Sequence, residues 1–200
     1  MRDGYVRRFS RTERAFHWVN AFFFLALLGT GMVLYLPSLE VAVGRRTLVK
    51  DIHFWTGVAW VPALVVIAVL GNTRALLRTA REIDRFDGDD LRWLAARRPA
   101  PPQGRFNAGQ KVNAALTAAF TVLFAVSGLL LWFGERDTRL RFASTVILHD
   151  GLAFAALILL VGHLYLAVIH PATRHALRGM TVGTVSEDWA ARHHSKWEPQ

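Results

Sequence analysis

The sequence predicts an all-α integral membrane protein, built as a bundle of four transmembrane helices. Its 200 residues are 52% hydrophobic, and a mean hydropathy of +0.25 is higher than a soluble domain usually shows. The apolar residues also gather in four long blocks that contain almost no charge. A helix needs about 20 mostly apolar residues to cross the hydrocarbon core, so each block is long enough. The blocks cover about residues 15–36, 52–71, 112–133 and 146–169.

The first block follows a basic N-terminal segment that contains Arg7, Arg8, Arg11 and Arg14. A secretory signal peptide would end in a small-residue cleavage site, and this block has none. We therefore expect a first helix that is retained in the protein.

The loop of residues 72–111, between the second and third blocks, is the one large polar segment inside the chain. Its first part predicts a single short surface helix that includes Leu76 and Leu91. Prolines between residues 98 and 102 would end that helix.

The tail of residues 170–200 contains two glycines together with Trp189 and Trp197. This composition suits an irregular segment with aromatic side chains at the membrane interface. With the tail and the loop included, residues 1–200 are expected to form one membrane domain.

The basic residues predict the orientation of the chain. The net charge is +9, but the basic residues lie between the apolar blocks, which argues against a nucleic-acid binder. The N-terminal segment, the 72–111 loop and the tail hold five, nine and four Lys or Arg, whereas the other two loops hold three each. By the positive-inside rule, both termini and the 72–111 loop are cytoplasmic. We therefore expect a multi-pass protein of a bacterial inner membrane, with lipid around its helices.

The chain has no cysteine. This excludes disulfides, thiolate chemistry and cysteine-ligated iron–sulfur clusters within the chain itself. Any such cluster has to belong to a partner.

Four of the eight histidines fall within the apolar blocks or at their ends, where ionisable residues are costly and usually functional. His149 and His163 are 14 residues apart, which is about 40° from a common helix face and about 21 Å along the helix axis. One helix thus presents two side chains at two depths. The four residues are His17, His53, His149 and His163.

Helix direction pairs these histidines by depth. The first helix starts in the cytoplasm near His17, and the second and fourth start outside near His53 and His149. His149 therefore lies at the depth of His53, and His163 at that of His17. Imidazole is a common axial ligand of haem iron, and two of them leave no open coordination position, which favours electron transfer. The sequence thus predicts two stacked b-type haems inside the bundle.

Simpler roles exist for single residues of this set. One intramembrane histidine is explained equally well as a hydrogen-bonded packing residue, but four that pair by depth are not. Gly31, Gly57 and Gly128 leave room for a flat macrocycle, and close helix packing explains any one of them as well. His170 would stand about 31 Å from His149, so we assign it to the interface. The remaining tail histidines suit surface or partner contacts.

Residues 105–111 (RFNAGQK) lead into the third helix, His149-Asp150 and Gly162-His163 lie in the fourth, and residues 170–183 (HPATRHALRGMTVG) follow it. In these segments the chain resembles the cytochrome b (gamma) subunit of membrane-bound respiratory formate dehydrogenase, over essentially its whole length. The cytochrome b subunits of nickel–iron hydrogenases are similar in their helices and histidines. A further class is a haem-free membrane anchor or transporter, whose histidines relay protons or bind a metal ion.

The resemblance implies that His17, His53, His149 and His163 ligate two haem b groups. It also implies two partners, a periplasmic iron–sulfur beta subunit and a molybdenum or tungsten alpha subunit that oxidises formate. Electrons would pass from the outer haem to the inner one and reduce a quinone, menaquinone or ubiquinone, at the cytoplasmic face. The chain itself would perform no formate chemistry.

The resemblance further implies a quinone site formed by Asn107 and Gln110 with His163. Ala108 and Gly109 would be its backbone neighbours. A quinone carbonyl needs hydrogen-bond donors and a proton supply near the inner surface, which this place offers. The alternative role for Asn107 is a cap of the third helix.

Three basic residues near the inner surface, Arg14, Arg105 and Lys111, are candidate partners of the haem propionates. Solvated charges that obey the positive-inside rule explain them at least as well.

Overall fold

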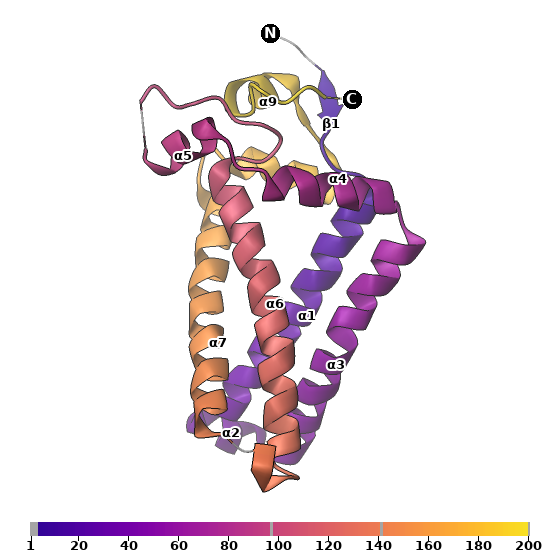
Figure 1. The fold of residues 1–200 in the computed structure, drawn as a ribbon, viewed down its shortest axis with the longest axis vertical. Coiled ribbons are helices and arrows are strands. Elements are labelled where there is room, and N and C mark those ends of the chain that lie inside the picture. The colour runs from indigo at the N-terminus through magenta and orange to yellow at the C-terminus, as the bar shows by residue number, and fades with distance from the viewer. Residues whose placement is uncertain (1–3, 97, 141, 200) are drawn as a thin grey trace. The chain divides into compact units, whose positions relative to one another are not determined.

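The computed structural model describes residues 4–96, 98–140 and 142–199. Its long helices are α1 (Arg11–Tyr35), α3 (Arg46–Leu70), α6 (Ala108–Gly134) and α7 (Ala143–Leu164), and the π-helical turn η2 (Tyr165–Ile169) extends α7 (Figure 1). All four are long and apolar enough to cross a membrane. The expected set of four membrane-spanning helices is confirmed, and each helix begins a few residues before its apolar block.

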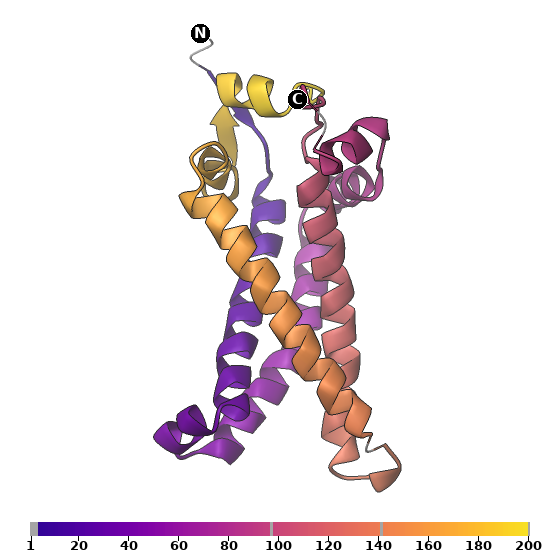
Figure 2. The same ribbon diagram turned by 90° about the vertical axis from the view of Figure 1, so that its left-hand side faces the viewer.

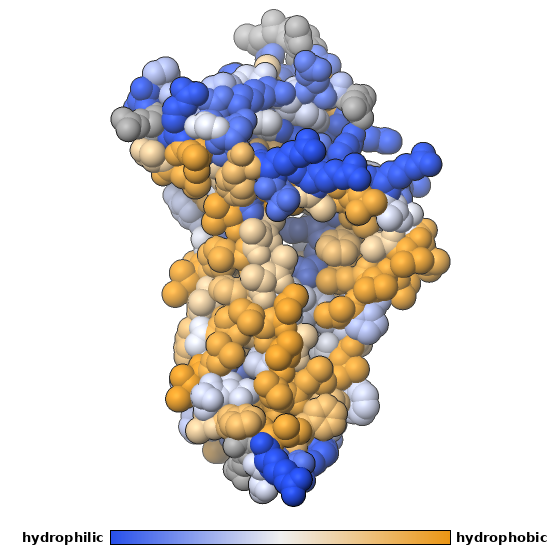
Figure 3. Space-filling model, in the orientation of Figure 1, coloured by the Kyte–Doolittle hydropathy of each residue, from blue (hydrophilic) through white to orange (hydrophobic). Residues whose placement is uncertain are grey.

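The long helices expose their apolar side chains. No more than 11% of the most apolar window of any of them is buried within the protein. Figure 3 shows hydrophobic residues spread over the helices on the face in view. Exposing such an apolar surface to water would cost free energy, whereas exposing it to lipid tails would not. The surface of these helices therefore suits contact with a bilayer.

Two compact units make up the chain. Unit 1 consists of Met1–Arg14, Asn72–Ala119 and Ile158–Gln200, and unit 2 of Ala15–Gly71 and Phe120–Leu157. Three of the four boundaries between the units fall inside α1, α6 and α7, and the fourth lies between Gly71 and Asn72.

Unit 2 contains a short helix, α2 (Pro37–Val43), that the apolar blocks do not predict. Pro37 occupies its first turn, and Gly44 ends it in the left-handed conformation (φ 64°), a pairing of residues typical of helix ends. The ring of Phe54 on α3 stacks on that of Trp132 on α6, with centroids 3.6 Å apart. This stacking holds α3 against α6.

In unit 1 the polar loop forms two helices, α4 (Thr73–Asp84) and α5 (Gly88–Leu94). The prediction of a single helix is therefore wrong. Asp87 accepts hydrogen bonds from the backbone N–H groups of Asp89 and Asp90, and the Asp90 carboxylate accepts one from the N–H of Asp87. This reciprocal capping box starts a new helix, so Leu91 lies on α5.

The prediction of an irregular tail is also wrong. The tail forms η3 (Arg174–Ala176), α8 (Leu177–Thr181), β2 (Thr184–Ser186) and α9 (Glu187–His193). β2 pairs antiparallel with β1 (Tyr5–Arg7), with Val6 opposite Val185 (Figures 1 and 2). Strands of three residues are too short to give an alternating pattern, so no signal in the sequence predicts this sheet.

A small core lies under the sheet in unit 1. Val185, Trp189 and Ala190 are almost fully buried, and Val6 and Trp197 pack against them. The two tail tryptophans, expected at the membrane interface, thus contribute to this core. The prediction for these residues is corrected accordingly, because their rings contact protein side chains.

Candidate functional site

In unit 2, the imidazole rings of His53 and His149 face each other. His53 lies on α3 and His149 on α7, and their ring centroids are 6.3 Å apart with ring planes inclined at 70°. The ring of Phe124 on α6 lies edge-on to His149, with centroids 5.3 Å apart. The pair predicted at one depth is thus brought together.

Each of these histidines is hydrogen-bonded through Nδ1 to a hydroxyl group. His53 Nδ1 lies 2.8 Å from Thr30 Oγ1 on α1, and His149 Nδ1 lies 2.8 Å from Ser127 Oγ on α6. Both contacts leave the Nε2 edge of the ring for another partner.

Glycines adjoin both imidazoles. A Cβ atom on Gly31 would lie 3.4 Å from His53 Cε1, and one on Gly128 would lie 3.7 Å from His149 Cε1. Gly151 is exposed, and a Cβ built on it would meet no described atom within 4 Å outside its own stretch of helix. Close packing of helices therefore does not explain that glycine.

His17 and His163 belong to different units, His17 to unit 2 and His163 to unit 1. Their predicted pairing stays a prediction. His163 lies in the last turn of α7, two residues before the start of the π-helical turn η2. Such turns occur frequently at functional sites. His170 ends that turn, where its N–H donates to Tyr165 O (2.9 Å).

Asn107 and Gln110 form a reciprocal cap at the start of α6. Gln110 N donates to Asn107 Oδ1 (2.9 Å), and Asn107 N donates to Gln110 Oε1 (3.0 Å). The capping role of Asn107 is thus confirmed, while the quinone role stays a prediction. Because the cap uses both amide oxygens, the two amide NH₂ groups remain as donors.

The backbone neighbours of this cap are tightly packed. Ala108 is fully buried, and its N–H donates to Gln103 Oε1 (2.8 Å). A Cβ on Gly109 would lie 3.0 Å from the Trp93 ring, so a larger residue would require this ring to move by a few tenths of an ångström. Trp93 on α5 therefore helps to fix the position of the Asn107–Gln110 cap.

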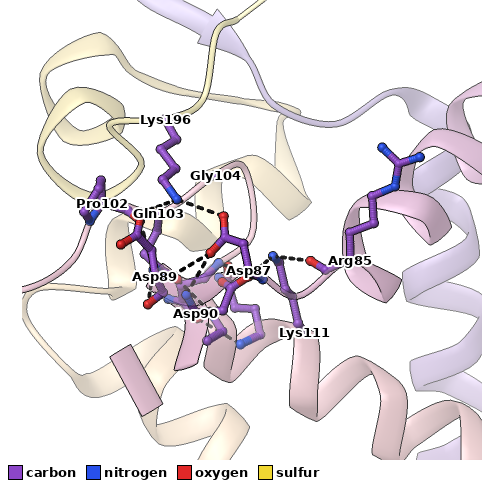
Figure 4. Close-up of polar contacts among 12 residues, drawn as sticks. Arg85, Asp87, Asp89, Asp90, Pro102, Gln103, Gly104, Lys111 and Lys196 are labelled. Carbon is purple, nitrogen blue, oxygen red and sulfur yellow. Dashed lines mark hydrogen bonds and ion pairs between the residues drawn. The ribbon is translucent and has the colours of Figure 1, made fainter. Parts of the chain in front are cut away.

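Lys111 and Arg105, two of the candidate propionate partners, are engaged in ion pairs within unit 1. Lys111 Nζ lies 2.6 Å from Asp90 Oδ2 and donates to Arg85 O, as Figure 4 shows. Arg105 is buried and lies 2.8 Å from Glu13 Oε1 and 2.6 Å from Glu82 Oε2. These contacts give both side chains a structural role, and their propionate role stays a prediction.

Arg14, the third candidate, donates to Thr181 O from Nη1 (2.6 Å). Its Nε is buried, with no acceptor among the residues that the structure describes. Arg14 also lines a cavity of about 450 Å³ together with Arg7 and Arg11. Of the three candidates, Arg14 is thus the one that pairs with no carboxylate among the described residues.

Sequence reasoning missed several residues of these sites. Arg8 is buried in unit 1 and donates from Nη2 to Arg105 O (2.7 Å) and to Gln110 Oε1 (3.3 Å). Burial, with the like charge of Arg105 beside it, lowers the pKa of Arg8 to about 9. Thr30 and Ser127 were missed as well. Their signal in the sequence is a hydroxyl residue followed directly by glycine, which occurs at each of them.

Comparison with known proteins decides the family. Residues 8–183 match the model of the prokaryotic cytochrome b561 family. The chain belongs to this family. Membership confirms the cytochrome b character that the histidines predict, and with it haem b and a role in electron transport.

This cytochrome is similar to three curated relatives. It is 28% identical to the formate dehydrogenase cytochrome b556(fdo) subunit of Escherichia coli K12, over 96% of this chain and 91% of the relative. It is 23% identical to the formate dehydrogenase cytochrome b556 subunit of Haemophilus influenzae, over 98% and 83%. It is 24% identical to the nitrate-inducible cytochrome b556(Fdn) subunit of E. coli K12, over 92% and 86%. The resemblance stated from the sequence is thereby confirmed.

The His53–His149 pair of the cytochrome fits a haem iron. A metal–imidazole bond is about 2 Å long and the ligating nitrogen lies about 1 Å from the ring centre, so two imidazoles on opposite sides of one iron have centres roughly 6 Å apart. The observed separation is 6.3 Å. The Nδ1 contacts of both rings leave Nε2 as the ligating atom. Spacing and hydrogen bonding thus both suit bis-imidazole ligation.

Proposed function

We propose that this cytochrome b is the membrane subunit of a formate dehydrogenase. It carries two haem b groups and passes electrons from a periplasmic iron–sulfur subunit to a quinone on the cytoplasmic side. The observation that carries the proposal is the facing pair of His53 and His149. The assignment to a formate dehydrogenase is supported by the names of the relatives, whose sequences align with this chain over 91% and 83% of their own lengths.

His53 and His149 hold the outer haem in this proposal. Haem iron supplies a carrier that takes up and releases one electron reversibly. If both imidazoles ligate the iron, they would leave no coordination position for oxygen or another small ligand. The residues of the pair therefore restrict the site to electron transfer.

His17 and His163 hold the inner haem. The proposal rests on the 14-residue spacing of His149 and His163, which places both imidazoles on nearly one face of α7, about 21 Å apart along its axis. The basic residues of the cytoplasmic segments favour an inner position for this second haem. Electrons then cross the hydrocarbon core from one haem to the other.

A quinone is reduced at the start of α6. The Asn107 and Gln110 side chains each present an amide NH₂ that the helix cap does not use, and quinone carbonyl oxygens accept such donors. Reduction of one quinone to quinol would take two electrons, delivered one at a time through the inner haem, and two protons from the cytoplasm. Formate oxidation on the opposite side would release charge outward, so both steps add to the membrane potential.

The ligand assignment predicts how haem content changes. His149→Ala should remove the outer haem and His163→Ala the inner one, each leaving one haem per chain. Haem in the purified complex is measured as pyridine haemochrome. His170→Ala is the matched control on the same segment, and it should leave both haems in place. Unchanged haem content in either of the first two variants would refute that residue's assignment.

The partner is tested separately. In the purified complex, formate should reduce the haems and hydrogen should not, and the co-purifying subunits should include an iron–sulfur protein. Reduction by hydrogen instead would favour the hydrogenase alternative. A purified complex without b-type haem bands would favour the haem-free anchor.

A further inference from the structure

Two hydroxyl residues in unit 2 hold the histidines of the outer pair in matching ways. Thr30 lies on α1 and bonds His53 of α3, and Ser127 lies on α6 and bonds His149 of α7, both at 2.8 Å. The residue after each hydroxyl is the glycine that adjoins the imidazole. The same arrangement thus occurs twice, once for each ligand.

The hydrogen-bond partners of the hydroxyls determine the tautomer of each histidine. A hydroxyl group has one proton to donate. Thr30 Oγ1 donates it to Ala26 O (2.8 Å), and Ser127 Oγ donates to Leu123 O (2.7 Å). The hydroxyl oxygens are therefore acceptors toward the rings, so Nδ1 of each imidazole carries the proton. Nε2 then has its lone pair available for a metal.

The two hydroxyls lie in surroundings that are poor in water. Ser127 is almost fully buried, with 1% of its surface exposed. Both residues lie within helices that are apolar enough to span the membrane, where water is scarce. An unbonded Nδ1–H would therefore be costly there. The hydroxyl also relays the bond to a backbone carbonyl, which strengthens both hydrogen bonds of the chain.

We propose that Thr30 and Ser127 are positioning residues that lock His53 and His149 as Nε2 ligands and lower the reduction potential of the iron between them. The inference rests on the proposed function, in which the outer haem lies between these two histidines. An Nδ1–H that donates a hydrogen bond makes the imidazole a stronger electron donor. A stronger donor stabilises Fe(III) relative to Fe(II). Two equivalent hydroxyls apply this effect from both sides of the haem.

The test uses the purified, assembled complex and the variants Thr30→Val and Ser127→Ala. Thr30→Val keeps the branched shape and removes the hydroxyl. The readouts are haem content, the midpoint potential of each haem, and the electron paramagnetic resonance spectrum of the ferric state. We expect both haems to remain, and one midpoint potential to shift positive. The shift should be about tenfold in the Fe(III)/Fe(II) equilibrium for each hydroxyl removed, or about 59 mV for one electron.

Two kinds of control separate the hydroxyl from its surroundings. Thr30→Ser and Ser127→Thr keep the hydroxyl and should retain the wild-type potential. Thr181→Val removes a hydroxyl that also bonds the carbonyl four residues earlier but adjoins no histidine, and it should change nothing. Loss of a haem in Thr30→Val but not in Thr30→Ser would also support the hydroxyl's role.

The outcomes that overturn the inference differ from those that overturn the proposed function. Unchanged potential and spectrum in both hydroxyl-free variants would overturn the role of the hydroxyls and leave the haem assignment intact. Equal loss of haem in Thr30→Val and Thr30→Ser would show a packing requirement and overturn it too. Full haem content in His53→Ala would instead refute the proposed function.

Discussion

At the scale of single residues, unit 1 is organised around two buried guanidinium groups. Arg8 and Arg105 each donate to the other's backbone carbonyl, at 2.7 and 3.1 Å. Arg105 is neutralised by Glu13 and Glu82, whereas no carboxylate among the described residues pairs with Arg8. Removing one partner of a buried ion pair leaves an uncompensated charge, which is strongly destabilising. The stability of this cluster therefore depends on each of its four side chains, which are those of Arg8, Glu13, Glu82 and Arg105.

The charge of Arg8 also acts on His194, which is buried in unit 1 and donates from Nδ1 to Gly104 O (2.6 Å). Burial, followed by the charges of Arg8 and His193, lowers the pKa of His194 from 6.5 to about 3. Its imidazole is therefore neutral while the tail is docked. An undocked tail would take up a proton at the ordinary pKa.

This difference predicts that docking of the tail weakens as the pH falls. Between about pH 6.5 and pH 3 the undocked state binds more protons than the docked state. The contribution of His194 to the stability of docking is therefore fully present above pH 6.5 and is lost progressively as the pH falls toward 3. The equilibrium constant for opening of α9 should rise roughly tenfold for each unit that the pH falls in this range. Hydrogen exchange of the α9 amides, corrected for the intrinsic effect of pH, measures it. In His194→Asn the slope should disappear, and an equal slope there would contradict the assignment.

At the scale of elements, the start of α6 combines two tasks in the same side chains. Asn107 and Gln110 cap the helix through their amide oxygens, and in the proposed function they bind quinone through their amide nitrogens. An apolar substitution removes both interactions at once, so it cannot separate them. Acidic substitutions can, because a carboxylate keeps the capping oxygens and has no NH₂.

We therefore expect the double variant Asn107→Asp, Gln110→Glu to keep both haems and a stable α6. Formate should still reduce the haems in the assembled complex. Quinone should reoxidise them at least tenfold more slowly, because a lost hydrogen-bond donor is worth about 1–3 kcal/mol. Stopped-flow recording of the haem bands measures the rate. Normal quinone turnover would refute the site, and loss of the inner haem would assign the segment to haem packing.

The long helices and the intramembrane histidines were predictable, because hydropathy and helical spacing are local properties of the sequence. The break before α5 had a local signal too, in the Asp87-Gly88 pair and the acidic residue at Asp90. The sheet of β1 with β2 had none, because its residues meet only through the fold. Thr30 and Ser127 had a local signal in the glycine that follows each of them, but the sequence could not show which histidine each contacts. Each hydroxyl and its histidine lie on different helices.

At the scale of the whole molecule, the distribution of basic residues predicts the orientation in the membrane. Reporters fused after Gln200 or inserted near Asp87 should be cytoplasmic, and one inserted near Val43 should be periplasmic. Alkaline phosphatase, which is active only in the periplasm, and a fluorescent protein that matures in the cytoplasm measure the two cases in parallel. Periplasmic activity of the fusion after Gln200 would reverse the proposed direction of electron flow.

The pairing of β1 with β2 sets an order of events during biosynthesis. β1 leaves the ribosome before the four long helices and β2 after them, because all four lie between the two strands in the chain. The sheet and the small core beneath it can therefore form only after the fourth helix has been made. Until then the N-terminal segment has no strand partner, and contacts between residues so distant in sequence form slowly. Closure of unit 1 is thus a late step in folding, because it follows the synthesis of all four long helices.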